Sequence, residues 1–156
     1  MLIIEELFNI SPQLSFHEND LSEETYASLK IEVEKLANQY YDSPFSRYGR
    51  TLDEIRINTW NGMVAEKYLI ESHGFEQNLE KYRDLKKNTF KIEIKTSTTL
   101  NSKNKILKKL HTATTKHDHV LMFNRNGKEY QIESYHQYDP IKKEYNEIEN
   151  YGVYNV

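Results

Sequence analysis

The sequence predicts an α/β domain in which helices flank a mixed β-sheet. Residues 89–97 alternate apolar and polar side chains, the pattern of a strand that buries one face. Two helical stripes precede this strand, and a basic helix separates it from an apolar run at residues 120–123. The resulting order is helix, helix, strand, strand, helix, strand, strand, which is typical of an α/β arrangement.

Length and composition indicate one globular domain. The chain has 156 residues, of which 37% are hydrophobic, enough for a core. No apolar run approaches the ~20 residues of a membrane span. The first residues carry acids rather than a basic segment, so we expect no signal peptide. With no cysteine, disulfides and thiolate zinc sites are excluded, and we expect a cytoplasmic protein.

Charge is distributed unevenly along the chain. Residues 81–116 contain eleven Lys or Arg and two acids, a net charge of +9, whereas the remainder carries ten bases and twenty-two acids, a net charge of −12. Such a basic window suits an anionic polymer; a solvated lysine-rich helix is the alternative. The candidate nucleic-acid contacts are Lys86, Lys87, Ser97, Lys103, Lys105, Lys108 and Lys109.

Residues 1–50 predict an N-terminal helical arm. A short helix or packing segment ends at Ser11-Pro12, and residues 16–20 are expected to form a loop. The first long helix begins after Asp20 or Ser22 and ends near Pro44. Its predicted apolar stripe contains Tyr26, Leu29, Val33, Leu36 and Tyr40.

The second long helix has stronger end signals. Thr51 and Glu54 can form a capping box, and Gly74 suits a left-handed C-terminal position. Gly62, in the middle of this helix, costs ~1 kcal/mol relative to alanine, a cost that is worthwhile if another element packs closely against its backbone. Glu66 lies one turn further along the same side, as a site residue or as a solvated glutamate.

A hairpin is expected next. A strand within residues 75–85 precedes a turn at 86–89, which places Asp84 opposite Lys91 and diagonal to Glu93. Glu93 and Lys95 share the polar face of the following strand, where a wet charged face is the alternative to a site.

The C-terminal part continues with short elements. A polar stretch at 98–104 leads into the basic helix, and an Asn126-Gly127 turn joins two strands. His117 and His119 share one strand face as candidate metal ligands, but no third ligand is evident. Residues 136–156 are a tyrosine-rich tail, suited to an interface or core, or to base stacking.

Four charged residues are thus expected to converge: Asp84, Glu93, Lys95 and Glu66. Neighbouring carboxylates repel unless a cation lies between them, and oxygen ligands favour Mg²⁺. A bound Mg²⁺ lowers the pKa of a water and stabilises charge on a phosphate. Lys95 can orient or deprotonate that water, or neutralise the phosphate; these three roles stay open.

This pattern resembles the PD-(D/E)XK nuclease superfamily. The match consists of Asp84, the strand motif Glu93-Ile94-Lys95 and the helix containing Glu66, and it covers residues 51–135. Arg83 stands where the motif has proline. The resemblance implies a restriction-endonuclease-like sheet and DNA hydrolysis with Mg²⁺, or Mn²⁺ as a substitute. It further implies that Asp84, Glu93 and the Ile94 carbonyl bind metal, that Lys95 is catalytic, and that Glu66 supports the metal or holds a second one.

The leading hypothesis is therefore a homodimeric endonuclease that cuts double-stranded DNA, with short-sequence recognition as in type II restriction enzymes as one form of it. A junction resolvase or repair nuclease is the alternative within the same class. A non-catalytic nucleic-acid-binding or interaction domain and an RNA nuclease also stay open.

Overall fold

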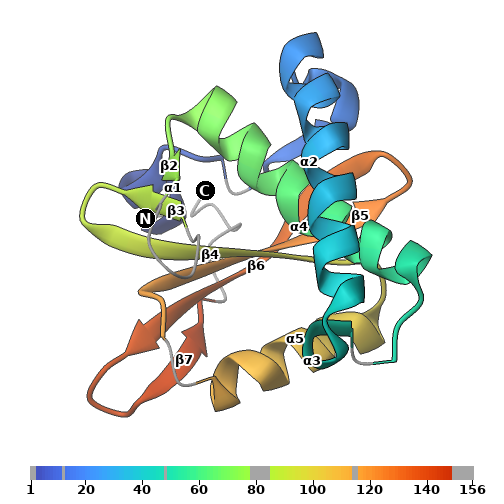
Figure 1. Cartoon of the computed structure of the whole chain (residues 1–156). Helices are drawn as coiled ribbons and strands as arrows, with labels where there is room; N and C mark the ends of the chain where they lie inside the picture. Colours follow the sequence, from blue (N-terminus) through green and yellow to red (C-terminus); the bar gives the residue numbers. More distant parts are fainter. Residues whose placement is uncertain (1–2, 12, 48, 78–84, 114–115, 149–156) are drawn as a thin grey trace.

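The computed structural model describes residues 3–11, 13–47, 49–77, 85–113 and 116–148. In these ranges the chain forms a curled mixed sheet flanked by helices, which confirms the α/β class (Figure 1). The helices are α1 (Ile3–Phe8), η1 (Glu18–Asp20), α2 (Glu23–Asp42), α3 (Pro44–Arg47), α4 (Leu52–His73) and α5 (Leu100–Thr112). The strands are β1 (Ser15–His17), β2 (Glu76–Gln77), β3 (Leu85–Lys87), β4 (Phe90–Ser97), β5 (His119–Asn126), β6 (Glu129–Asp139) and β7 (Glu144–Glu147).

The sheet is built around one parallel pair of strands. Its order is β1-β6-β5-β4-β3-β2, and β7 also pairs with β6. Strands β4 and β5 run parallel, and all other pairings are antiparallel. A parallel pair requires a crossover connection, and α5 lies in that crossover. The basic helix is therefore held next to β4.

Two apolar clusters cover the sheet. Ile92 and Ile94 of β4 join a large core that includes Val64 and Leu69 of α4. A smaller cluster lies under α5, where Leu110 packs with other buried residues. Because alternate residues of a strand face opposite ways, Glu93 and Lys95 lie on the face of β4 away from the large core.

The predicted helix ends of α2 and α4 are confirmed. The Ser22 hydroxyl accepts a hydrogen bond from the Thr25 amide at 3.2 Å. Thr51 and Glu54 form a reciprocal capping box, with bonds of 3.1 and 3.2 Å. Gly74 has a φ of 68°, the left-handed conformation expected of it.

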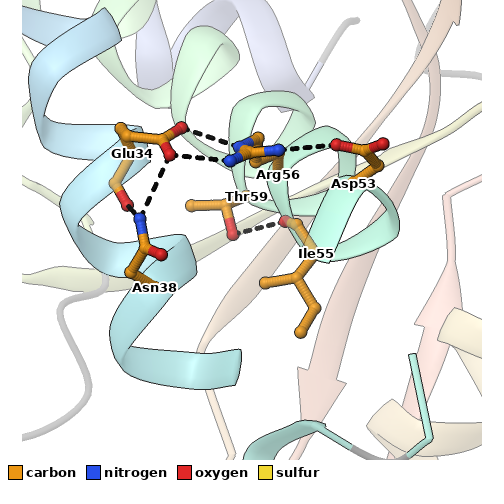
Figure 2. A network of polar contacts seen from close by, with 6 residues as sticks. All are labelled: Glu34, Asn38, Asp53, Ile55, Arg56 and Thr59. Atoms are coloured by element: carbon orange, nitrogen blue, oxygen red, sulfur yellow. Dashed lines mark hydrogen bonds and ion pairs between the residues drawn. The ribbon is translucent and has the colours of Figure 1, made fainter. Parts of the chain in front are cut away.

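Helices α2 and α4 are joined by the polar network in Figure 2. The Arg56 guanidinium donates two hydrogen bonds to the Glu34 carboxylate, at 2.7 and 2.9 Å, and a third to Asp53 at 2.6 Å. The Arg56 hydrogen bond lowers the pKa of Glu34 below its usual value. Asn38 also donates to Glu34, so the paired geometry is held from both helices.

Residues 15–20 are a strand and a 3₁₀ turn, so the predicted loop is wrong. Phe16 of β1 pairs with Tyr130 of β6 and is only 4% exposed. Its ring is stacked between Tyr68 and Tyr130, with centroid distances of 4.0 and 4.9 Å. Both partners lie far away in sequence, and local composition carries no signal of this pairing.

The first hairpin has a different register from the one expected. Lys91 pairs with Lys86, so the prediction that Asp84 lies opposite Lys91 is wrong. The turn is Asn88-Thr89 rather than four residues, and Asn88 adopts a φ of 56° that permits the tighter turn. Asp84 itself lies outside the described residues.

The other boundaries shift for similar reasons. Helix α5 begins earlier than predicted, because Thr99 caps it by accepting a hydrogen bond from the Ser102 amide at 3.1 Å. In the second hairpin Asn126 pairs with Glu129, which moves the turn one residue later. Strand β6 continues to Asp139 and pairs with β7, so the described part of the tyrosine-rich tail belongs to the sheet. No helix in the described ranges is long and apolar enough to cross a membrane.

Replacing Phe16 tests whether β1 is integral to the sheet. Phe16→Ala removes a buried aromatic ring and should lower the free energy of unfolding by about 3–5 kcal/mol, measured by urea denaturation. The matched control is Phe45→Ala on α3, where the side chain is 80% exposed and the change should stay within about 0.5 kcal/mol. Similar small losses in both variants would contradict the placement of β1.

Candidate active site

Two adjoining cavities meet where α4 approaches β4. The first, here the lysine cavity, has a volume of about 450 Å³ and lies between α4, β4 and α5. The second, here the helical cavity, has a volume of about 610 Å³ and lies mainly between α2, α3 and α4. Both are lined by Asn58, Gly62, Glu66 and Glu93. The structure thus brings Glu66 and Glu93 to the boundary between the two cavities.

Glu66 is a half-buried carboxyl group beside other charges. Desolvation by burial, together with the neighbouring Glu93 charge, raises its pKa to about 8. Lys95 acts against this shift, so all three predicted residues lie within electrostatic reach of one another. Among the described residues Glu66 has no hydrogen-bonding or ion-pair partner. A cation or a proton in the site would relieve the repulsion between the two carboxylates.

Glu93 is held between two basic side chains. Lys95 Nζ lies 4.0 Å from Glu93 Oε1, and His117 Nε2 lies 3.5 Å from Oε2. The His117 backbone N–H donates to the Tyr145 hydroxyl at 2.8 Å, which anchors the histidine against β7. His117 is therefore a neighbour of the candidate site, a position that the sequence pattern did not indicate.

The two histidines do not form a shared metal site. The ring of His119 stacks on Tyr135, whose hydroxyl lies 2.6 Å from His119 Nδ1. Phe8 and Phe90 meet the same ring edge to face. Burial lowers the pKa of His119 to about 4, so it is a neutral core residue.

The predicted lysines divide into two groups. Lys105 and Lys109 line the lysine cavity together with Lys95, whereas Lys108 is exposed on α5 outside that lining. Lys103 Nζ lies 3.5 Å from Glu133. The remaining candidates lie elsewhere: Ser97 is buried against Phe123 and Glu133, Lys86 is in β3, and Lys87 donates to the His73 carbonyl at 2.9 Å.

Asn61 is a buried polar residue that the sequence reasoning did not single out. Its side-chain oxygen accepts a hydrogen bond from the Arg125 guanidinium. Arg125 in turn pairs with the buried Glu18 carboxylate at 3.3 Å, which also accepts from Trp60 at 2.7 Å and Tyr130 at 2.9 Å. With its oxygen engaged, the Asn61 amide has its NH₂ group left to donate into the lysine cavity that it lines.

Gly62 has a different role from the one expected. A Cβ added there would meet nothing within 4 Å, so close packing against the backbone is not the reason for this glycine. Gly62 instead lines both cavities, and the space beside its Cα is open. Asn58, Gly62 and Glu66 recur every four residues and so share one face of α4, a periodicity that could have revealed this stripe.

The described residues supply some, but not all, of the oxygen ligands that a divalent cation such as Mg²⁺ needs. Among the described residues no group of three His, Cys, Asp or Glu side chains is arranged to hold a metal ion. Two carboxylates nevertheless meet at the cavity boundary, and Mg²⁺ is usually held by one or two carboxylates with water and phosphate oxygens. Ile94 lines the same cavity, whereas Asp84 is not described.

The raised pKa of Glu66 predicts a pH-dependent stability. Because the folded protein binds the Glu66 proton more tightly than the unfolded chain does, this proton stabilises the fold at low pH. The stabilisation is lost as the pH rises from about 4.5 to about 8. Relative to Glu66→Gln, wild-type protein in EDTA should therefore lose on the order of 3 kcal/mol of unfolding free energy between pH 5 and pH 9. Urea denaturation across this range measures it, and parallel profiles would contradict the assignment.

The chain was compared with protein-family models, curated proteins and solved structures. No family model, no curated protein and no solved structure matches the chain.

Proposed function

We propose that this protein is a Mg²⁺-dependent nuclease that hydrolyses DNA phosphodiester bonds on a restriction-endonuclease-like sheet. The observation that carries the proposal is the meeting of Glu66, Glu93 and Lys95 at a cavity also lined by Lys105 and Lys109. Carboxylates that hold a divalent cation beside cations that bind phosphate are what phosphodiester hydrolysis needs.

In this proposal the lysine cavity binds the scissile phosphate. Lys105 and Lys109 supply positive charge from α5, and the Asn61 NH₂ group supplies a neutral donor from α4. A lysine ammonium acts as a point charge and does not fix the orientation of a phosphate. The Asn61 amide and the Ser102 hydroxyl, which line the same cavity, would orient it by hydrogen bonds. The cluster of donors neutralises charge as the phosphorus gains a fifth oxygen.

Glu93 and Glu66 would hold Mg²⁺, with the Ile94 carbonyl and Asp84 as further ligands. When bound, the ion lowers the pKa of a water and stabilises charge on the phosphate. Glu66 must lose its proton for this, so metal binding and deprotonation of Glu66 are coupled. His117 keeps the Glu93 carboxylate oriented from the side opposite Lys95.

Lys95 would act on the attacking water. Its ammonium lies near Glu93, so it can donate to the water that the metal site presents, or to a phosphate oxygen as charge develops. Removing it should therefore reduce the rate of hydrolysis more than the affinity for DNA.

Cleavage of double-stranded DNA would use a homodimer, since each chain presents one such site and two strands need two cuts. A structure-selective nuclease is the second candidate, favoured by the large helical cavity next to the phosphate site. A binding domain without catalysis fits less well, because a half-buried carboxyl group that has no partner among the described residues costs stability.

Cleavage assays with supercoiled, linear, branched and single-stranded DNA test the proposal. Wild-type protein should cut with Mg²⁺ or Mn²⁺ and not with EDTA. Asp84→Ala, Glu93→Ala and Lys95→Ala should each lose about 100-fold or more in rate, because each removes a group that acts on the reacting atoms. DNA affinity, measured by fluorescence anisotropy, should change little in Lys95→Ala.

The assay has a clear negative outcome. Activity that survives in Glu93→Ala, or no cleavage of any of these substrates with any divalent ion, would contradict a metal-dependent nuclease. Cleavage of RNA in preference to DNA would reassign the substrate.

The lysines of α5 offer a matched pair for DNA binding. If Lys109 contacts a phosphate, Lys109→Ala should weaken binding and reduce the slope of log affinity against log salt by about 0.9. Lys108→Ala, one residue away but outside the cavity lining, should change the slope much less. Equal effects of the two substitutions would indicate diffuse attraction to the helix rather than a phosphate in the lysine cavity.

A further inference from the structure

We infer that the helical cavity receives one unpaired nucleobase beside the phosphate held in the lysine cavity, so that the preferred substrate is DNA with an unpaired nucleotide. This inference rests on the proposed function and names its substrate class. A base inside a duplex is stacked on both faces, so it reaches a walled cavity only when it is unpaired or rotated out.

The walls combine an apolar face with polar edges. Tyr40 and Leu36 of α2 and Met63 of α4 provide aromatic and apolar surface. Ser46, Asn58 and Gln77 line the same cavity and supply both donors and acceptors. Single-stranded bases are recognised by stacking on aromatic side chains together with hydrogen bonds to their edges.

The charged residues that line the two cavities indicate which cavity binds the base and which binds the phosphate. Among the described residues that line the helical cavity, Arg50 is the only Lys or Arg. Its guanidinium already donates to the Ser46 carbonyl at 2.7 Å and to the Arg47 carbonyl at 3.1 Å. Glu32 lines this cavity alone, whereas Glu66 and Glu93 lie at the boundary that it shares with the lysine cavity. Lys95, Lys105 and Lys109 line only the lysine cavity, so a phosphate is favoured there and the neutral base is left for the helical cavity.

The two cavities adjoin, as a nucleotide requires. Asn58, Gly62, Glu66 and Glu93 line both. The open space beside Gly62 leaves room at the junction for the sugar that links base and phosphate. The volume of about 610 Å³ lies within the usual range of pockets for small organic groups.

Tyr40 and Tyr41 provide a matched test. Tyr40 lines the cavity and is 40% exposed, so Tyr40→Ala should fold. Tyr41 does not line it and instead packs beside Arg47, whose guanidinium lies 5.0 Å from the Tyr41 ring centre. Both variants and wild-type protein are titrated, with Ca²⁺ in place of Mg²⁺, against one duplex that is fully paired and one that carries a single unpaired adenine.

Wild-type protein and Tyr41→Ala should bind the duplex with the unpaired adenine about tenfold more tightly than the paired duplex. In Tyr40→Ala the ratio should fall close to one. Equal affinity of wild-type protein for the two duplexes would overturn the inference, and so would a preference that Tyr40→Ala leaves intact.

Cleavage is read separately with Mg²⁺, so the two proposals can fail independently. A Tyr40-dependent preference without any cleavage supports the base site and contradicts the nuclease function. Cleavage that requires Lys95 but shows no preference for the unpaired adenine supports the nuclease and overturns the base site.

Discussion

The parallel pairing of β4 with β5 is the constraint on which the site depends. Two parallel strands cannot be joined by a tight turn, so the chain must cross over, and α5 is part of that crossover. The crossover starts at the end of β4. This strand carries Glu93 and Lys95 on the face away from the main core. Lys105 and Lys109 are thereby brought to the same cavity as the carboxylates. A hairpin in place of this crossover would separate the positive charges from the acidic ones.

The other wall of the site depends on α2 and α4. Arg56, Glu34 and Asp53 join the two helices at the surface (Figure 2), and Val33 and Leu29 of α2 pack into the main core. Exposed ion pairs of this kind stabilise weakly, so the apolar contacts carry most of the packing energy. The polar network instead helps to hold the relative position of the two helices that enclose the helical cavity.

Two glutamates differ in how the fold compensates the removal of their carboxyl groups from water. Glu18 is buried but fully engaged by Trp60, Tyr130 and Arg125, so its burial is compensated. Glu66 is half-buried and has no such partner among the described residues, and desolvation of its carboxyl group raises its pKa. The contrast between these two glutamates distinguishes a carboxylate held by fixed partners from one whose pKa is perturbed in a cavity, and such perturbed groups are enriched at functional sites.

The sequence alone determined the elements whose signals are local. Caps at Ser22 and Thr51, the glycine at Gly74 and the alternation along β4 depend on neighbouring residues, and the structure has them where they were predicted. These signals are short-range, so a linear pattern contains them. The proximity of Glu66 to Glu93 was also expected, but it joins two elements far apart in the sequence, so the fold decides it.

Only the tertiary structure decided which segments pair and what each side chain faces. The burial of Phe16, the register at Lys86 and Lys91, and the place of Tyr145 in the second cluster all depend on contacts between distant residues. The same holds for His117 beside Glu93. Such contacts are selected by burial of the whole chain, because a residue's neighbours in space are set by the packing of entire elements rather than by local propensity.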